Sequence, residues 1–431
     1  MASISPIQSL PVELLREIFE YRVEKKEVFA VSQVCSRWRQ IAHNSPRLWT
    51  DTVRVDVERL LDSVYLDGLK IWLARSEPLL ISLSCVAGSH NRYGVLEQIF
   101  HTSFRWRSLQ FQQSALSLLP ISVIAKLAET PLSALEDLDL GGIEEGPPPV
   151  TITSSALPRL RRVTISHYTF ILHIQLPWAQ LTHLTFSTYR GDVAINVLAQ
   201  CTSLVEAAVY FNTWDELAQP AQPIQTLSEL RSLTLGPDGE EGYISPFFDR
   251  VSAPALEKLD MDFVEMDGNI EWSETSFTAF QMRSSRITYL ELNGCFHLSP
   301  ENLCTALRHL PCIAELKLGY CYDIVGNEFM TMLVNKDGVT PLAPRLHNLV
   351  LMMVDRNVFA PNHFVDMLSS RWWTEADVSV PRAVARWTHV ELEMRGDVSL
   401  EFTEIIQGLQ DRGLPLKFYA IPSSFLPAET L

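Results

Sequence analysis

A short apolar motif repeats along most of this 431-residue chain, and it limits the possible folds more than any other feature of the sequence. In each copy an apolar residue is followed three positions later by a second one, and two positions after that by a third. Complete copies begin at residues 106, 135, 160, 181, 230, 256, 287, 313, 346 and 387, and weaker copies at residues 50, 78 and 204. The mean step between copies is about 28 residues, so each copy predicts a short strand followed by a return segment.

Motifs at this spacing are typical of leucine-rich-repeat solenoids, in which a helix or an irregular segment follows each strand. The strand positions alternate apolar with polar residues, whereas buried parallel strands of an ordinary α/β sheet protein would form continuous apolar runs. We therefore predict an α/β leucine-rich-repeat solenoid, a horseshoe, over residues 50–431. Its end is predicted to be a cap, formed by a helix near residues 402–409 and an alternating strand at residues 414–420. The ordinary α/β sheet protein is the alternative fold.

Residues 7–49 break the repeat and predict a small all-helical module. A first helix is expected directly after Leu10, with two apolar stripes: Val12, Leu15 and Phe19 on one side, and Leu14 and Ile18 on another. A second helical pattern covers residues 31–42, and residues 46–49 close the segment. About forty residues rarely bury two apolar faces by themselves, so we expect a partner to cover one of them.

Three short motifs in this module carry a family resemblance: LPxELLxxIF from Leu10, VCxRWRxIA from Val34 and PxLW from Pro46. In this pattern the segment resembles an F-box, the trihelical module that docks substrate receptors onto the Skp-type adaptor of cullin-RING ubiquitin ligases. It departs from the family at residues 21–28, where a leucine-rich stretch is common. The resemblance implies an adaptor-binding surface of Leu10, Pro11, Leu14, Ile18, Val34 and Trp38. The alternative is a cap that shields the first repeat, but a cap does not explain the second apolar face.

The remaining residues resemble the leucine-rich-repeat class of F-box proteins, with short segments near residues 75 and 106 that are similar to fungal members. The repeats that end at Cys295 and Cys321 resemble a cysteine-containing subtype. The resemblance implies a substrate-recognition subunit of a Skp-cullin-F-box ubiquitin ligase, without catalytic residues of its own, which brings substrate lysines close to the transferred ubiquitin. A binding scaffold of the same fold with no ubiquitin-ligase link is the alternative function, and an unrecognised hydrolase or metalloenzyme is the third.

Composition restricts the partners and the compartment. The chain has 51 acidic and 35 basic residues, a net charge of -16, which disfavours nucleic acids and membrane surfaces. Glu13 and Glu17 interrupt the region where a signal peptide would be apolar, and no apolar run is long enough to span a bilayer. Seven cysteines without a C-x-x-C pair predict free thiols in a reducing compartment. We therefore expect a soluble protein of the cytoplasm, the nucleus or both.

Sequence motifs for common enzymes are absent, and the candidate metal ligands have simpler explanations. Cys295 and Cys321 share one repeat phase, which explains them as stacked interior thiols instead of ligands of a zinc site. That zinc site would add Cys304, Cys312, His297 and His309. A calcium loop over residues 260–267 lacks the oxygen ligand at its fifth position and the glycine at its sixth. No metal, no cofactor and no enzymatic activity are predicted.

The polar strand positions predict the substrate-binding surface, because solenoids bind through the inner face of their strands. From residue 135 onward these positions carry nine acidic and three basic side chains, a net of six negative charges. This surplus either marks a surface for a basic protein segment or echoes the acidity of the whole chain. Two tryptophans in a long insertion either contact a partner or pack back on the last repeats. The candidate substrate-binding residues are Asp260, Asp262, Tyr289, Glu291, Glu315, Trp372 and Trp373.

Overall fold

A computed structural model describes most of the chain, and its contacts divide it into two compact units, Met1–Leu181 and Thr182–Leu431. The described residues are 6–22, 28–86, 93–112, 118–144, 149–166, 174–214, 223–237, 241–263, 269–295, 298–321, 324–355, 358, 360–373, 383–396 and 398–421. The helical module and the first repeats share the first unit.

The first unit opens with the helical module and continues with five parallel strands. The module consists of η1 (Pro6–Ser9), α1 (Val12–Arg22), α2 (Val28–Val34), α3 (Ser36–His43) and η2 (Pro46–Trp49). The strands follow in the order β1 (Val53–Asp56), β2 (Ile81–Val86), β3 (Trp106–Gln112), β4 (Asp137–Asp139) and β6 (Arg162–Ile165). Their return segments are η3 (Glu58–Leu61), α4 (Ser63–Arg75), η4 (Tyr93–Arg105), α5 (Ile121–Glu129) and η5 (Trp178–Gln180), with a small pair β5 (Val150–Thr151) and β7 (Ile174–Gln175).

The second unit repeats one plan, a strand followed by a helical return. Its parallel strands are β8 (His183–Arg190), β9 (Glu206–Thr213), β11 (Ser232–Pro237), β14 (Lys258–Asp262), β16 (Tyr289–Asn293), β17 (Glu315–Gly319), β18 (Asn348–Asp355), β19 (His389–Arg395) and β20 (Leu416–Ile421). The helices are α6 (Gly191–Leu198), α7 (Ser245–Arg250), α8 (Glu274–Arg283), α9 (Pro300–Arg308), α10 (Asn327–Leu333), α11 (Pro361–Ser370) and α12 (Leu400–Asp411). Two small pairs, β10 (Gln225–Thr226) with β13 (Val251–Ser252) and β12 (Glu241–Tyr243) with β15 (Asn269–Glu271), complete it.

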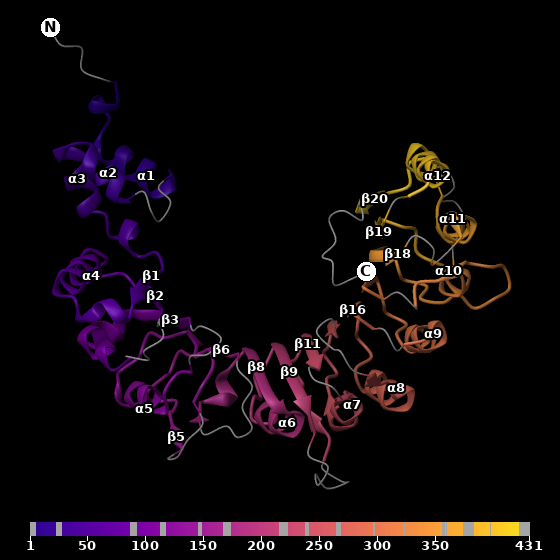
Figure 1. Ribbon diagram of the computed structural model, residues 1–431, viewed down its shortest axis with the longest axis horizontal. Coiled ribbons are helices and arrows are strands. Elements are labelled where there is room, and N and C mark those ends of the chain that lie inside the picture. Colours follow the sequence, from indigo (N-terminus) through magenta and orange to yellow (C-terminus); the bar gives the residue numbers. More distant parts are fainter. Residues whose placement is uncertain are drawn as a thin grey trace. The chain divides into compact units, whose positions relative to one another are not determined.

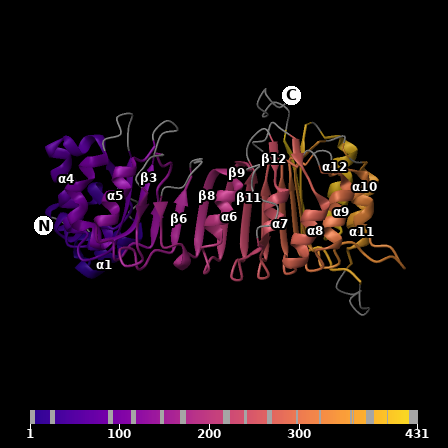
Figure 2. The ribbon, with the colours of Figure 1, turned by 90° about the horizontal axis from the view of Figure 1, so that it is seen from below.

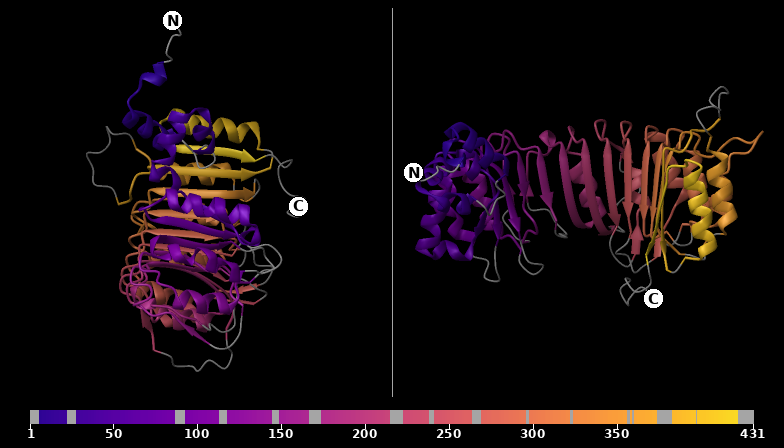
Figure 3. Two further views of the ribbon diagram at one scale, coloured as in Figure 1. Left: turned by 90° about the vertical axis from the view of Figure 1, so that its left-hand side faces the viewer. Right: turned by 90° about the horizontal axis from the view of Figure 1, so that it is seen from above.

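In this unit the helices cover one face of the sheet and leave the other face of the strands uncovered among the described residues (Figures 1 and 2). The right-hand view of Figure 3 looks toward the strand side. Equivalent leucines of successive repeats pair in register, such as Leu259 with Leu290 and Leu290 with Leu316, and are at most 1% exposed. The apolar motif positions therefore form the core ladder, and the polar positions between them form the open face.

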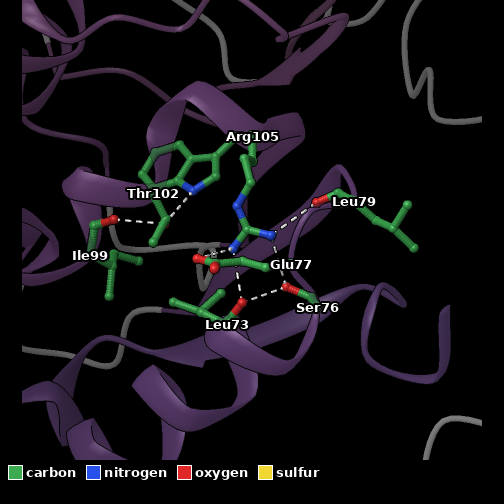
Figure 4. A network of polar contacts seen from close by, with 8 residues as sticks. Leu73, Ser76, Glu77, Leu79, Ile99, Thr102 and Arg105 are labelled. Carbon is green, nitrogen blue, oxygen red and sulfur yellow. Dashed lines mark hydrogen bonds and ion pairs between the residues drawn. The ribbon is translucent and has the colours of Figure 1, made fainter. Parts of the chain in front are cut away.

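Buried arginines join neighbouring repeats at the ends of their return segments, which the apolar motif does not reveal. Arg105, 4% exposed, donates to the carbonyl oxygens of Leu73 at 2.8 Å and Leu79 at 3.0 Å, and to the hydroxyl of Ser76 at 3.2 Å (Figure 4). Its neighbour Glu77 lies 3.7 Å away as an ion-pair partner. The guanidinium thus supplies donors for the Leu73 carbonyl in the last turn of α4 and for the Leu79 carbonyl in the segment that follows the helix.

The predicted α/β architecture, a small helical module followed by a leucine-rich-repeat solenoid, is confirmed. The predicted cap is also present, as α12 followed by β20. The return segment before β3 is η4, a 3-10 segment. The boundary between domains at residue 49 stays a prediction.

Candidate functional site

The helical module closes around one small core. Leu15 and Phe19 of α1, Ile41 of α3 and Trp49 of η2 are at most 5% exposed and pack together. Val12, predicted on the same stripe as the two α1 residues, is 40% exposed instead. One side of α1 is therefore used for the core, and its other side faces solvent.

Several apolar side chains of the predicted adaptor-binding surface are exposed to solvent. Leu14 and Ile18 of α1 are 46% and 42% exposed, and Val34 at the end of α2 is 61% exposed. Pro11 is also exposed and directly precedes α1, where its carbonyl oxygen accepts a hydrogen bond from the backbone N–H of Leu15 at 3.1 Å. Exposed apolar groups concentrated on so small a module are typical of a protein-binding surface.

A groove of about 810 Å³ runs along this side of α1. Tyr21 belongs to it and is 86% exposed, although the sequence prediction missed it. The sequence could have identified Tyr21, because Leu14, Ile18 and Tyr21 are spaced as residues on one face of a helix. The groove is lined by Leu10, Leu14, Glu17, Ile18, Glu20, Tyr21 and Arg47.

Leu10 and Trp38 differ from the other predicted adaptor residues, because both lie partly buried against the module core. The ring of Trp38 lies 4.9 Å from that of Phe19, measured between centroids. Arg37 donates from Nη2 to the carbonyl oxygen of Leu10 at 2.6 Å and so fixes the chain before α1. Truncation of Trp38 would therefore remove core packing together with any contact surface.

The helical pattern over residues 31–42 is divided into two helices, α2 and α3. Cys35 has an extended backbone between α2 and α3, and its Sγ accepts a hydrogen bond from the backbone N–H of Trp38 at 3.4 Å. This cap ends α2 at Val34 and leaves the Val34 side chain exposed. Cysteine is not among the preferred N-cap residues, so the break has little signature in the sequence.

The module is anchored to the first repeat through tryptophans. Trp72 of α4 donates from Nε1 to the carbonyl oxygen of Trp49 at 2.9 Å, and the two rings lie 4.9 Å apart. The Arg75 guanidinium lies 4.7 Å from the Trp49 ring centroid, and Phe29 of α2 lies 5.4 Å from the Trp72 ring. These aromatic and cation–π contacts therefore hold the module against α4 of the first repeat.

On the open strand face of the second unit, Glu291 is the centre of a polar network. Its Oε1 lies 2.6 Å from Nζ of Lys317 and accepts a hydrogen bond from Nδ2 of Asn293 at 3.1 Å, and its Oε2 accepts from the hydroxyl of Tyr289 at 2.5 Å. Burial raises the pKa of Glu291, but these three partners lower it further than burial raises it, so the net shift is downward. The carboxylate is therefore already satisfied within the chain.

Tyr289 also has an internal partner. Register pairs it with Lys258, whose Nζ lies 4.8 Å from the Tyr289 ring centroid, and on its other side with Glu315, which is half-exposed. Burial and the hydrogen bond to Glu291 raise the pKa of the Tyr289 phenol. One face of the ring thus carries a cation of the chain itself, which reduces its capacity to receive a partner's cation.

Asp260 of β14 is the acid best placed for a partner, with Asp262 beside it on the same strand. Burial and the charge of Glu291 raise the pKa of Asp260 to about 6. Its Oδ1 is buried, and no hydrogen-bond donor to this atom occurs among the described residues. Asp262 is exposed toward the end of the strand. A cationic group of a partner that reached Asp260 would donate a hydrogen bond to its Oδ1.

Tyr210 lies beside these two acids, and the sequence prediction missed it. The Tyr210 ring lies directly over Gly236 of the next strand, since a Cβ at Gly236 would clash with Cδ1 of Tyr210. Burial, then the charges of Asp262 and Asp260, raise the pKa of the Tyr210 phenol. A glycine at a polar strand position next to an aromatic residue is the sequence signal that could have identified this contact.

The two tryptophans of the insertion are both half-buried. The guanidinium of Arg386 lies 4.2 Å from the Trp372 ring centroid, and Gly413 lies beside the same ring. These contacts favour local packing for Trp372. Residues 374–382 of the insertion lie outside the described residues.

The strand face carries basic groups that the sequence count left out. β19 extends to Arg395, and β20 adds Lys417, which pairs in register with Glu391. His389 also lies 3.2 Å from Glu391, between Nε2 and Oε2. These basic groups therefore lie beside acids of the same sheet and offset part of its negative charge.

The described candidate metal ligands form no cluster of three. Cys295, Cys304 and Cys321 are buried, and Cys312 is half-buried. Burial and the contact with Cys321 raise the pKa of Cys295, and the hydrogen bond from Cys295 lowers that of Cys321, so these two thiols lie together. Across the described parts of the chain no three potential ligands gather around one point, and His297 and the calcium-loop residues Glu265 and Asp267 lie outside those parts.

Comparisons with known proteins identify the N-terminal module. Residues 7–54 match the F-box-like family model. No curated protein matches the chain. Among solved structures, the crystal structure of the Rad7 and Elc1 complex in yeast aligns with a TM-score of 0.40 and 14% sequence identity, over 83% of this chain and 95% of that chain, a similarity too low to carry an inference.

These observations define a chain with an N-terminal F-box-like domain followed by a leucine-rich-repeat solenoid. Within its described residues, no helix is both long and apolar enough to cross a membrane.

Proposed function

We propose that this chain is a substrate-recognition subunit of a Skp-cullin-F-box ubiquitin ligase. Its F-box-like domain binds a Skp-type adaptor, and its solenoid binds the protein to be ubiquitinated. The observation that carries the proposal is the match of residues 7–54 to the F-box-like family, on a module whose solvent side exposes apolar residues. The chain supplies no catalytic residue and acts by positioning, in the cytoplasm, the nucleus or both.

The adaptor-binding surface is proposed to centre on Leu14, Ile18 and Val34, with Pro11 at the start of α1. Leu10 and Trp38 contribute chiefly by holding α1 and α3 in place, because both pack on the core. Tyr21 extends the surface along the groove. Such surfaces concentrate their binding free energy in a few central apolar anchors.

The test is binding of the full chain to a purified Skp-type adaptor. Leu14→Ala with Ile18→Ala removes two exposed anchors without opening the core, and we expect a loss of about 2 kcal/mol or more, roughly thirtyfold in affinity. Calorimetry or surface plasmon resonance measures the change, and circular dichroism checks the fold.

Val64→Ala with Ile71→Ala is the matched control, because both residues of α4 are as exposed and apolar but lie outside the proposed surface. We expect this control to bind as the wild type does. Failure of the wild-type chain to bind the adaptor would favour the alternative, a binding scaffold with no ubiquitin-ligase link.

On the substrate side we propose that the solenoid binds a basic segment of its substrate. Asp260 and Asp262 carry the attraction, with Glu315 two strands away and Tyr210 packed against the aliphatic part of the incoming side chain. Support comes from the buried, unpaired Oδ1 of Asp260 and from the position of Tyr210. Tyr289 and Glu291 stabilise this surface through the hydrogen bond between them. In the insertion, Trp373 is a second candidate contact, whereas Trp372 packs locally against Arg386.

A further inference from the structure

Lysine is rare in this chain. The sequence has eight lysines against 27 arginines, although lysine is ordinarily among the commonest residues of soluble proteins. No lysine occurs between Lys126 and Lys258, or between Lys336 and Lys417. The positive surface charge is therefore carried mainly by arginine, which cannot accept ubiquitin.

Several of the few lysine amines have partners within the chain. Lys317 is held 2.6 Å from a Glu291 carboxylate oxygen with its side chain 29% exposed, and Lys258 lies over the Tyr289 ring. Lys126 lies 3.6 Å from carboxylate oxygens of two glutamates. Lys70, Lys336 and Lys417 are exposed, and Lys25 and Lys26 lie outside the described residues.

The chemistry of ubiquitin transfer gives this scarcity a consequence. An unprotonated lysine Nζ attacks the thioester carbonyl carbon of ubiquitin on a conjugating enzyme and forms an isopeptide bond. The thioester C–S bond breaks, and the proton lost by the amine ends on the departing thiol. A receptor tethered in the ligase presents its own lysines at high effective concentration, so a lysine-rich receptor would compete with its substrate.

We infer that this chain is built to resist ubiquitin transfer to itself, through replacement of surface lysine by arginine and through engagement of the strand-face lysines Lys258 and Lys317. The inference rests on the proposed function. It adds that the receptor outlasts the substrates it delivers, and that residual self-modification of the described part of the chain falls on the exposed lysines Lys70, Lys336 and Lys417.

The test uses the full chain bound to a Skp-type adaptor in a reconstituted cullin-RING ligase with a ubiquitin-loaded conjugating enzyme. In one variant, three exposed arginines become lysines, which keeps the charge and adds acceptors: Arg159→Lys, Arg286→Lys and Arg308→Lys. We expect self-conjugation about twofold faster or more than in the wild type, because the number of exposed acceptors on the tethered chain rises. Glutamine at the same three positions is the control that adds no amine, and it is expected to leave the rate unchanged.

A second variant tests the engaged lysine directly. Glu291→Gln removes the carboxylate charge that holds Lys317, so mass spectrometry of the conjugates is expected to find ubiquitin on Lys317 in the variant but not in the wild type. Equal rates for the wild type and the three-lysine variant, with the adaptor bound to both, would overturn this inference alone. Absence of adaptor binding by the wild type would overturn the proposed function and this inference with it.

Discussion

The ionised carboxylate of Asp260, on the open strand face, is disfavoured by its surroundings. The side chain lies between Lys258, which favours its ionised form, and Glu291, which opposes it, and partial burial removes much of its hydration. Glu291 is stabilised in its ionised form by three partners. Of the two neighbouring carboxyl groups, Asp260 is therefore the one whose ionisation is disfavoured. Sites that bind cationic groups commonly hold such unpaired acceptors before the ligand arrives.

We predict that Asp260→Asn changes the pH dependence of stability. The folded state raises the pKa of Asp260 from 3.8 to about 6, so between these values the folded chain holds the proton more firmly than the unfolded chain. In the wild type this group therefore lowers the free energy of unfolding as pH rises from about 4 to about 6. The side-chain amide of Asp260→Asn cannot ionise, so the variant gains stability relative to the wild type across that range.

Urea unfolding at several pH values between these limits measures the effect. Asp262→Asn is the control, because the exposed neighbour lies on the same strand and changes the charge equally. A stability difference between wild type and Asp260→Asn that stays constant with pH would contradict the prediction.

At the scale of elements, buried arginines at the ends of the return segments connect neighbouring repeats through hydrogen bonds to backbone carbonyls. We call each such arginine a clasp. Arg371 follows α11, is fully buried and donates to the carbonyl oxygens of Leu333 at 3.0 Å and Ala343 at 2.9 Å. Arg283 at the end of α8 donates in the same way to the carbonyl oxygen of Phe248 at the end of α7. Burial lowers the pKa of Arg371 to about 10, so the guanidinium stays charged at neutral pH.

We predict that Arg371→Met destabilises the second unit by about 3 kcal/mol or more, because it leaves buried carbonyl oxygens without donors. Arg371→Lys is expected to recover only part of this loss, since one ammonium cannot match the fork of a guanidinium. Denaturant unfolding measures both. Arg286→Met, at an exposed position, is the control and should change the stability by less than about 0.5 kcal/mol. A loss for Arg371→Met no larger than that of the control would show that the clasp is dispensable.

At the scale of the whole molecule, the net charge of -16 favours basic partners, but the structure shows that the acids are not equally available. Glu291 and Glu391 have side-chain partners within the chain, whereas Oδ1 of Asp260 is buried and accepts no hydrogen bond from the described residues. The attraction for a basic segment is therefore local to β14 and adjoining strands.

We predict that a labelled lysine-rich peptide binds the full chain and a glutamate-rich peptide of equal length does not. Asp260→Lys with Asp262→Lys should weaken binding at least about tenfold, and wild-type affinity should fall as salt rises from about 50 to 150 mM, because screening shortens the range of the attraction. Fluorescence anisotropy measures both. Glu404→Lys with Asp411→Lys, exposed acids of α12, is the matched charge control. Binding that does not depend on salt and is unchanged by Asp260→Lys with Asp262→Lys would contradict the prediction. The peptide would then bind at another site, and Trp373 is the next candidate.

The sequence by itself determined the solenoid, because a repeating period places the same apolar positions in one ladder whatever the return segments contain. Leu259, Leu290 and Leu316 are buried where the motif puts them. It also determined the F-box-like module, since Leu15 and Phe19 fit one face of a helix and Leu14 and Ile18 another. Period and spacing are local properties, so they can be identified in the sequence without knowledge of any long-range contact.

Only the tertiary structure decided which groups on those ladders are engaged within the chain. The motif fixes the face of each side chain but not its partner across the strands, so the bond from Lys317 to Glu291 and the packing of Tyr210 over Gly236 could not be read from spacing. The cap by Cys35 that divides α2 from α3 was hidden in the same way. Cross-strand pairs and buried clasps depend on residues distant in sequence, and their energies are set by burial that no local pattern records.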